Sequence, residues 1–130
     1  MGEQPSVYKS LSKYLDIVPI NWNKIKLPTK KVSIVAGFSI GATLACDYAM
    51  KNRVKTLILC SMTPGVESLN VVKADKIIFL VGEKEDWVIK DTRRLMKKLA
   101  IPHEIKIVKK AGHKIDANYR TTLFNIIKRF

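Results

Sequence analysis

The sequence predicts a single α/β domain over residues 1–130, a three-layer sandwich with a reduced, mainly parallel sheet of about five strands. Short apolar runs of strand length alternate with segments of helical periodicity, which is the order that strand–helix–strand units produce. Most strand segments lack a polar face, and this is typical of strands covered by helices on both sides. Hydrophobic residues make up 47% of the chain, enough to bury a core at this length.

The predicted elements follow one another in order. The first helix begins behind Ser6, a good N-cap residue, and its apolar residues recur at helical spacing. A continuous apolar run then predicts the strand over 32–38, and small residues lead from it directly into a helix. Thr63-Pro64-Gly65 ends a later strand. The predicted helices are 7–15, 40–51, 91–100 and 117–130, and the predicted strands are 16–22, 32–38, 56–62, 76–81 and 104–108.

Chemically capable side chains follow three of the predicted strands. Ser39 comes directly after the strand over 32–38, Glu85 and Asp86 follow the strand over 76–81, and His113 follows the last strand. In parallel sheets, ligands bind beyond the carboxyl ends of the strands, so these residues are expected at one edge. The second histidine, His103, is expected to be an exposed loop residue.

Ser39 stands in a Gly-x-Ser-x-Gly pattern between a strand and a helix. A sharp turn there holds the serine backbone in a strained conformation and exposes its hydroxyl. Gly37 and Gly41 are expected to relieve crowding on either side of the turn. The helix that follows directs backbone N–H groups at developing negative charge. A serine hydroxyl also needs a base, which an imidazole oriented by a carboxylate provides.

From residue 7 onward, the chain resembles the C-terminal part of an α/β hydrolase. The residues resembling that family's nucleophile elbow are IVAGFSIGA at 34–42, those resembling the acid loop are FLVGEKEDWV at 79–88, and AGH at 111–113 resembles the histidine loop. The resemblance implies Ser39 as the nucleophile and His113 as the general base and acid. It also implies the backbone N–H of Ile40 as one oxyanion donor.

The resemblance leaves two candidates for the acid of the triad. The family commonly places the acid three residues after the glycine, which is Glu85, but aspartate is the commoner residue type. Asp86 is followed by Trp87 and Val88, which also resembles the family pattern of an acid followed by apolar residues. We assign the acid to Asp86 and keep Glu85 as the alternative.

The chain departs from the family pattern at its N-terminus. It begins where the family's first strands should already have ended, so the loop that supplies the second oxyanion N–H is not evident. We expect a backbone N–H of residues 2–4 to act as that donor. An exposed strand edge pairs readily with other chains, so a homodimer covering it is expected. Residues 61–75 are too few for a lid domain, which favours small acyl groups.

These features predict a serine hydrolase for small carboxylic esters or thioesters, acting through an acyl-serine intermediate. Transfer of the acyl group to another acceptor stays open. The other alternative is a catalytically weak or inactive binding module for an anionic partner, because the net charge is +13. Nucleic acid is not the favoured partner, since no nucleic-acid-binding motif accompanies the spread basic residues.

Neither a metal nor another cofactor is implied, because the histidines and carboxylates lack metal-ligand spacing. The longest mostly apolar run, 32–46, is shorter than the roughly 20 residues that span a bilayer, so no membrane segment is expected. No secretory signal is evident at the N-terminus, and Cys46 and Cys60 lie in apolar segments typical of reduced core cysteines. The expected compartment is the cytoplasm.

Overall fold

The computed structural model describes residues 33–62, 65–114 and 116–128. The helix expected over 7–15, the strand expected over 16–22 and the donors expected at residues 2–4 lie outside this part of the chain. The described elements are β1 (Ile34–Phe38), α2 (Ile40–Lys51), β2 (Val54–Cys60), α3 (Val66–Leu69), β3 (Ala74–Gly82), α4 (Asp86–Met96), β4 (His103–Val108) and α5 (Ala117–Ile127).

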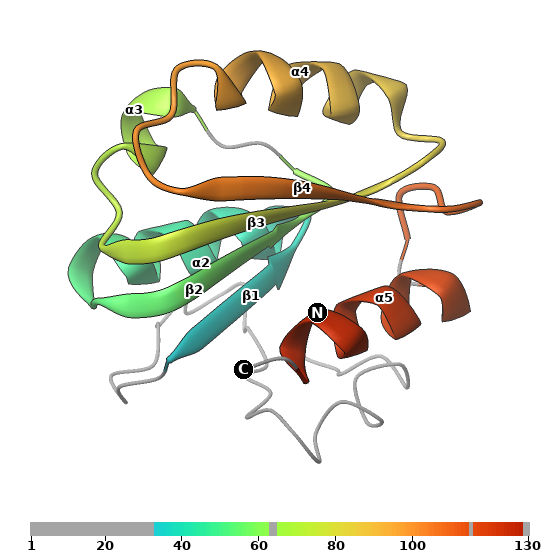
Figure 1. The fold of residues 1–130 in the computed structure, drawn as a ribbon, viewed down its shortest axis with the longest axis horizontal. Helices are drawn as coiled ribbons and strands as arrows, with labels where there is room; N and C mark the ends of the chain where they lie inside the picture. Colours follow the sequence, from blue (N-terminus) through green and yellow to red (C-terminus); the bar gives the residue numbers. More distant parts are fainter. Residues whose placement is uncertain (1–32, 63–64, 115, 129–130) are drawn as a thin grey trace, which may run out of the picture.

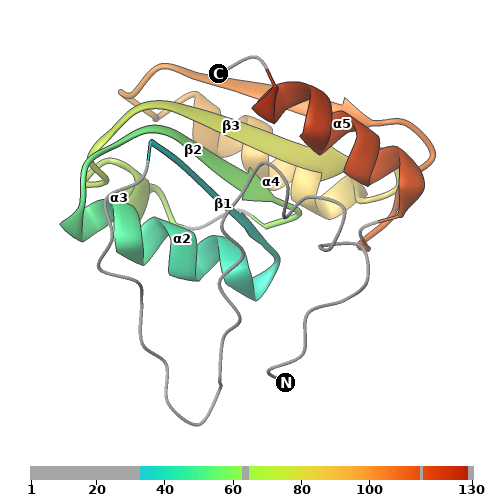
Figure 2. The same ribbon diagram turned by 90° about the horizontal axis from the view of Figure 1, so that it is seen from below.

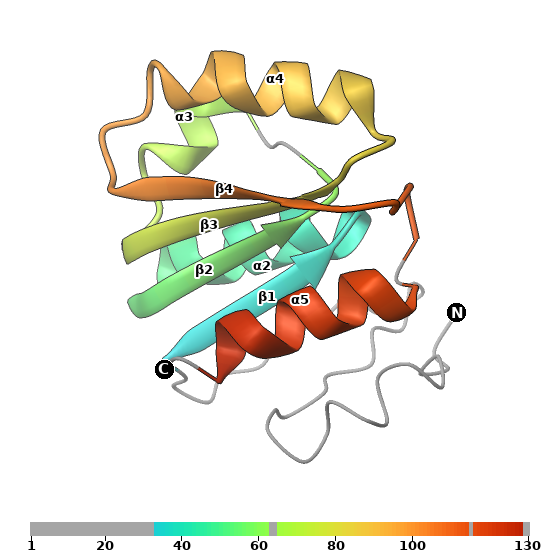
Figure 3. The same ribbon diagram turned by 45° about the vertical axis from the view of Figure 1, so that its right-hand side comes forward.

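The described strands form one parallel sheet with the order β1-β2-β3-β4. All of them point the same way, so their carboxyl ends meet at one edge (Figure 1). Of the described helices, α2, α3 and α4 cover one face of the sheet and α5 covers the other (Figures 2 and 3). This confirms the predicted fold class, with four described strands against an expectation of about five.

The core consists of two layers because successive side chains of a strand point to opposite faces of the sheet. In β2, Leu57 and Leu59 pack in the cluster that includes α2 and α4. Ile58 and Cys60 alternate with them and pack in the cluster that includes α5. Strands β2 and β3 are therefore apolar on both faces, which is why the sequence shows them as unbroken apolar runs.

Several element boundaries differ from the predicted ones. Helix α4 begins at Asp86 rather than at residue 91, because the chain turns immediately after Gly82 and the Asp86 carboxylate suits the positive end of a helix dipole. Strands β2, β3 and β4 begin one or two residues earlier than predicted. A one-turn helix, α3, lies between residues 62 and 76, where neither a helix nor a strand was predicted. In the described part of the chain, no helix is both long and apolar enough to cross a membrane.

Gly37 allows β1 and α2 to approach closely at the Ser39 turn. A Cβ atom on Gly37 would lie 2.0 Å from the carbonyl oxygen of Gly41, which is far closer than two non-bonded atoms can approach. Among the residues that the structure describes, a Cβ atom on Gly41 would meet nothing within 4 Å. The expectation that glycine relieves crowding is therefore confirmed for Gly37 and wrong for Gly41, which contributes its backbone carbonyl to the contact.

We predict opposite outcomes for alanine at these glycines. Gly37→Ala should lower the free energy of unfolding by about 3 kcal/mol or more, because the strand and helix must separate to admit the methyl group. Gly41→Ala is the matched control and should stay within about 1 kcal/mol of wild type, since alanine is favoured in helices and space is open. Urea denaturation measures both variants. Equal destabilisation would show that the close approach does not constrain this turn.

Candidate active site

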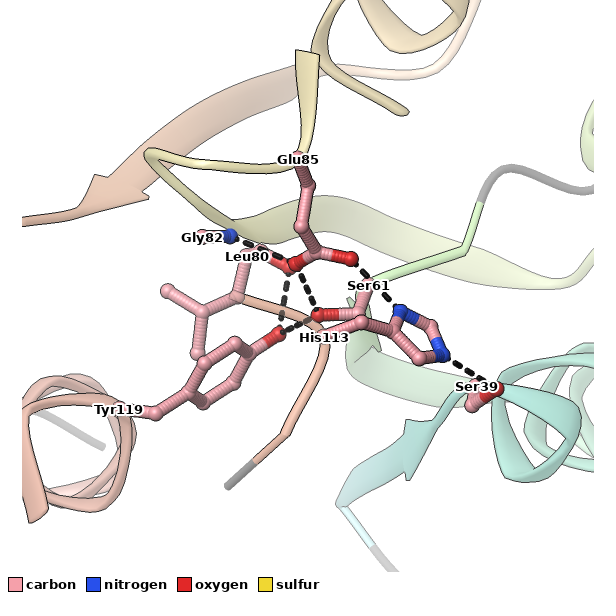
Figure 4. Close-up of polar contacts among 7 residues, drawn as sticks. All are labelled: Ser39, Ser61, Leu80, Gly82, Glu85, His113 and Tyr119. Carbon is pink, nitrogen blue, oxygen red and sulfur yellow. Dashed lines mark hydrogen bonds and ion pairs between the residues drawn. The ribbon is translucent and has the colours of Figure 1, made fainter. Parts of the chain in front are cut away.

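The carboxyl-terminal edge of the sheet brings together side chains from three strand ends. Ser39 directly follows β1, Glu85 lies three residues after the end of β3 at Gly82, and His113 lies in the loop between β4 and α5. Their side chains converge on one another in Figure 4. Residues separated by up to 74 positions in the chain thus meet at one place.

The backbone of Ser39 adopts a strained conformation, as the sequence pattern predicts. Its φ of 56° and ψ of −120° lie outside the regions that L residues prefer. A hydrogen bond from its N–H to the carbonyl of Cys60, 2.8 Å long, ties the turn to the end of β2. Ser39 is the N-cap residue of α2, yet its side chain makes no capping hydrogen bond. The hydroxyl is therefore left for another partner.

A continuous line of polar contacts joins Ser39, His113 and Glu85 (Figure 4). Ser39 Oγ lies 3.0 Å from His113 Nε2, and His113 Nδ1 lies 2.6 Å from Glu85 Oε2. A carboxylate can only accept, so Nδ1–H donates to Glu85. In the neutral ring, Nε2 then accepts the proton of the Ser39 hydroxyl. This is the arrangement by which a base activates a serine.

The carboxylate that contacts His113 belongs to Glu85, which corrects our preference for Asp86. Glu85 is the N-cap residue of α4, so it still belongs to the turn that faces the sheet edge. Asp86 is the first residue of the helix, and it is exposed to solvent. Residue type favoured aspartate, whereas the position of the helix start decides which side chain points inward.

Glu85 is buried, with 4% of its side chain exposed, whereas 53% of the His113 side chain is exposed. The Oε1 atom of Glu85 accepts hydrogen bonds from the Gly82 N–H at 2.9 Å and from the Ser61 hydroxyl at 2.6 Å. The ionised carboxylate is thus compensated inside the protein while the imidazole faces solvent. Ser61 was not among the predicted site residues, although it directly follows a strand, as Ser39 does, and this position could have identified it.

An aromatic side chain supports the imidazole ring. The Phe38 ring lies next to that of His113, with a centroid distance of 5.3 Å and a tilt of 37°. Phe38 also contacts the Tyr119 ring edge-on at 5.6 Å. Since Phe38 directly precedes Ser39, the same turn that presents the serine also packs against its neighbouring histidine.

The other candidate groups occupy different places. Ile40 is the first residue of α2, where backbone N–H groups have no acceptor within the helix. His103 begins β4 and is half-buried, so its prediction as an exposed loop residue is wrong.

Burial raises the pKa of Cys46 to about 11 and that of Cys60 to about 12, so neither thiol is an activated nucleophile near neutral pH. Among the residues with described positions, no cluster suits a metal ion.

The fold is similar to that of a known esterase. The sequence matches no protein-family model and no curated protein. A solved structure, that of esterase PE8, superposes with a TM-score of 0.57 at 21% sequence identity. The match covers 74% of this chain and 49% of the esterase, so the chain spans about half the esterase's length. The likeness is one of fold, and it agrees with the α/β fold class that the sequence predicts.

We predict that the Ser39 turn stores strain that glycine relieves. Ser39→Gly should have a free energy of unfolding about 1 kcal/mol or more above that of Ser39→Ala, because only glycine adopts this backbone conformation without cost. Both variants lose the same hydroxyl, so alanine is the matched control. Thermal and urea unfolding provide the comparison, and equal stabilities would contradict the strain.

Proposed function

We propose that this chain is a serine hydrolase that cleaves small carboxylic esters or thioesters through an acyl-Ser39 intermediate. The observation that carries the proposal is the line of contacts from Ser39 Oγ through His113 to the buried Glu85 carboxylate. The likeness of the fold to an esterase supports the same class of reaction. Each of the three side chains has the contact that its role requires.

In the acylation step, Ser39 Oγ attacks the carbonyl carbon of the substrate while its proton passes to His113 Nε2. The new Oγ–C bond displaces the carbonyl electron pair onto oxygen, and the Ile40 N–H at the start of α2 stabilises that charge. The carbonyl re-forms as the alcohol or thiol leaves with the proton from Nε2. Water then repeats these steps against the acyl-serine, releasing the acid and restoring Ser39.

Glu85 holds His113 in the reactive tautomer and stabilises the imidazolium that forms in each step. Its burial strengthens this attraction, since a charge removed from water interacts more strongly with a nearby charge. The exposed position of His113 leaves the site open to solvent, and the connection between β2 and β3 contains only the one-turn helix α3 in its described part. Both features favour small acyl groups over long lipid chains.

We predict that a fluorophosphonate probe labels the wild-type protein once. Ser39→Ala should abolish the adduct, and His113→Ala should slow labelling by about 10²–10⁴-fold, because the general base is lost. Intact-mass spectrometry counts the adduct, and circular dichroism confirms that each variant folds. A folded wild-type protein that takes no label would contradict the hydrolase and favour a binding module for an anionic partner.

We predict that the two neighbouring acids respond differently to neutral substitution. Glu85→Gln should slow labelling by about 10²-fold or more, because an amide N–H facing Nδ1 favours the tautomer that carries its proton on Nε2. Asp86→Asn removes the same charge one residue away and should change the labelling rate by less than about threefold, since the group is exposed. The opposite ranking would restore Asp86 as the acid.

A further inference from the structure

We infer that Ser61 and Tyr119 are positioning residues that hold the Glu85 carboxylate in the orientation His113 needs. The inference rests on the proposed function and extends the site inward by one layer of buried hydroxyl groups. In Figure 4, the polar contacts of their hydroxyl groups run to Glu85, to each other and to the Leu80 carbonyl, and not to Ser39. They act through the carboxylate.

The length of the glutamate side chain makes positioning residues necessary. Glutamate has one more rotatable bond than aspartate, so its carboxylate has more orientations to lose before it can serve one partner. Two donors on Oε1, the Gly82 N–H and the Ser61 hydroxyl, fix the plane of the group. The other oxygen, Oε2, is then directed at His113 Nδ1.

The hydroxyl groups of Ser61 and Tyr119 form a cluster with fewer protons than contacts. Ser61 Oγ contacts Glu85 Oε1 at 2.6 Å and the Tyr119 hydroxyl at 2.7 Å, and the Tyr119 hydroxyl contacts the Leu80 carbonyl at 2.8 Å. Only two hydroxyl protons are available for these three contacts. The negatively charged carboxylate is the strongest acceptor, so it determines which way the protons point. The carboxylate takes the Ser61 proton, and Tyr119 donates its own to Ser61 or to Leu80.

Both hydroxyl groups belong to buried residues. Tyr119 is fully buried and Ser61 is 2% exposed, so their hydroxyl groups have given up their hydrogen bonds to water. Burial also raises the pKa of Tyr119, which keeps the phenol protonated and able to donate. A buried hydroxyl is costly unless protein partners replace its hydrogen bonds to water, and for Ser61 that partner is the charged carboxylate of Glu85.

Tyr119 supports the His113 imidazole indirectly, by two routes. Its hydroxyl reaches the carboxylate through Ser61, and its ring packs edge-on against Phe38, whose own ring contacts His113. Tyr119 belongs to α5, the helix that covers the opposite face of the sheet from α2. Helix α5 therefore orients both Glu85 and His113, although none of its residues belongs to the line of contacts from Ser39 through His113 to Glu85.

The test compares hydroxyl-deleting variants of both residues. Ser61→Ala and Ser61→Gly remove the same hydroxyl, but Ser61 has a φ of 57°, which glycine adopts more easily than alanine. Comparing them separates loss of the hydroxyl from loss of stability. Tyr119→Phe keeps the ring against Phe38 and removes only the phenol oxygen. Thr56→Val is the matched control, because it deletes a buried hydroxyl near the other end of β2.

Two measurements are made on each variant. The first is the rate of fluorophosphonate labelling of Ser39. The second is the downfield proton resonance of His113 Nδ1–H in the unlabelled protein, which reports the His113–Glu85 hydrogen bond without requiring activity. We expect both Ser61 variants to label about tenfold more slowly and to lose or shift this resonance. Tyr119→Phe should show a smaller change in the same direction, and Thr56→Val should match wild type in both.

The outcomes separate this inference from the proposed function. Wild-type labelling, together with Ser61 variants that keep both the rate and the resonance, would overturn the positioning role. A wild-type protein that takes no label would overturn the hydrolase, and the resonance would then decide whether Ser61 still orients Glu85. A loss of labelling in Ser61→Ala that Ser61→Gly restores would also overturn the role, because backbone strain would explain it.

Discussion

The candidate site depends on one buried carboxylate, that of Glu85. An ionised group removed from water is costly unless protein donors replace the lost hydration. Here the backbone at the end of β3, the Ser61 hydroxyl after β2 and the His113 ring after β4 provide those donors. Three strand ends must therefore stay in register for the charge to be compensated, and the parallel pairing of β2, β3 and β4 maintains that register.

The turn at Ser39 shows how packing sustains a conformation that the chain would not choose alone. The close approach of Gly37 to the Gly41 carbonyl joins β1 to α2, and the bond from the Ser39 N–H to Cys60 ties the turn to β2. Between these restraints the serine backbone stays in an unfavourable region while its hydroxyl points to His113. Strain of this kind persists where the surrounding structure outweighs its cost.

The cluster of Ser61 and Tyr119 gives α5 a role in the site beyond covering the sheet. Tyr119 packs among apolar side chains of the layer that includes Leu80 and Ile78, yet its hydroxyl ends in a polar cluster beside the acid. A side chain with an apolar body and a polar tip suits this boundary. Docking of the helix onto the sheet and orientation of the carboxylate are thus two consequences of the same contact.

Much of this protein could be predicted from its sequence, because the determining features are local. Unbroken apolar runs identified the buried strands, and the small residues around Ser39 identified the turn from β1 into α2. Strand ends in a parallel sheet share one edge, so Ser39 and His113 could be placed together before any coordinates were known. The choice between Glu85 and Asp86 depended on where α4 begins, which neighbouring residues alone did not determine.

Tertiary structure decided the features that depend on the spacing of separate elements. Ser61 and Tyr119 are 58 residues apart and meet only because β2 and α5 pack against each other. The need for glycine at residue 37, and not at 41, follows from the distance between a strand and a helix. The sequence by itself determined which chemically capable side chains follow the strands, because their positions along the chain are local features. Packing determined which carboxylate faces the histidine, because a buried charged group needs hydrogen-bond partners inside the protein and Glu85, not Asp86, is the buried one.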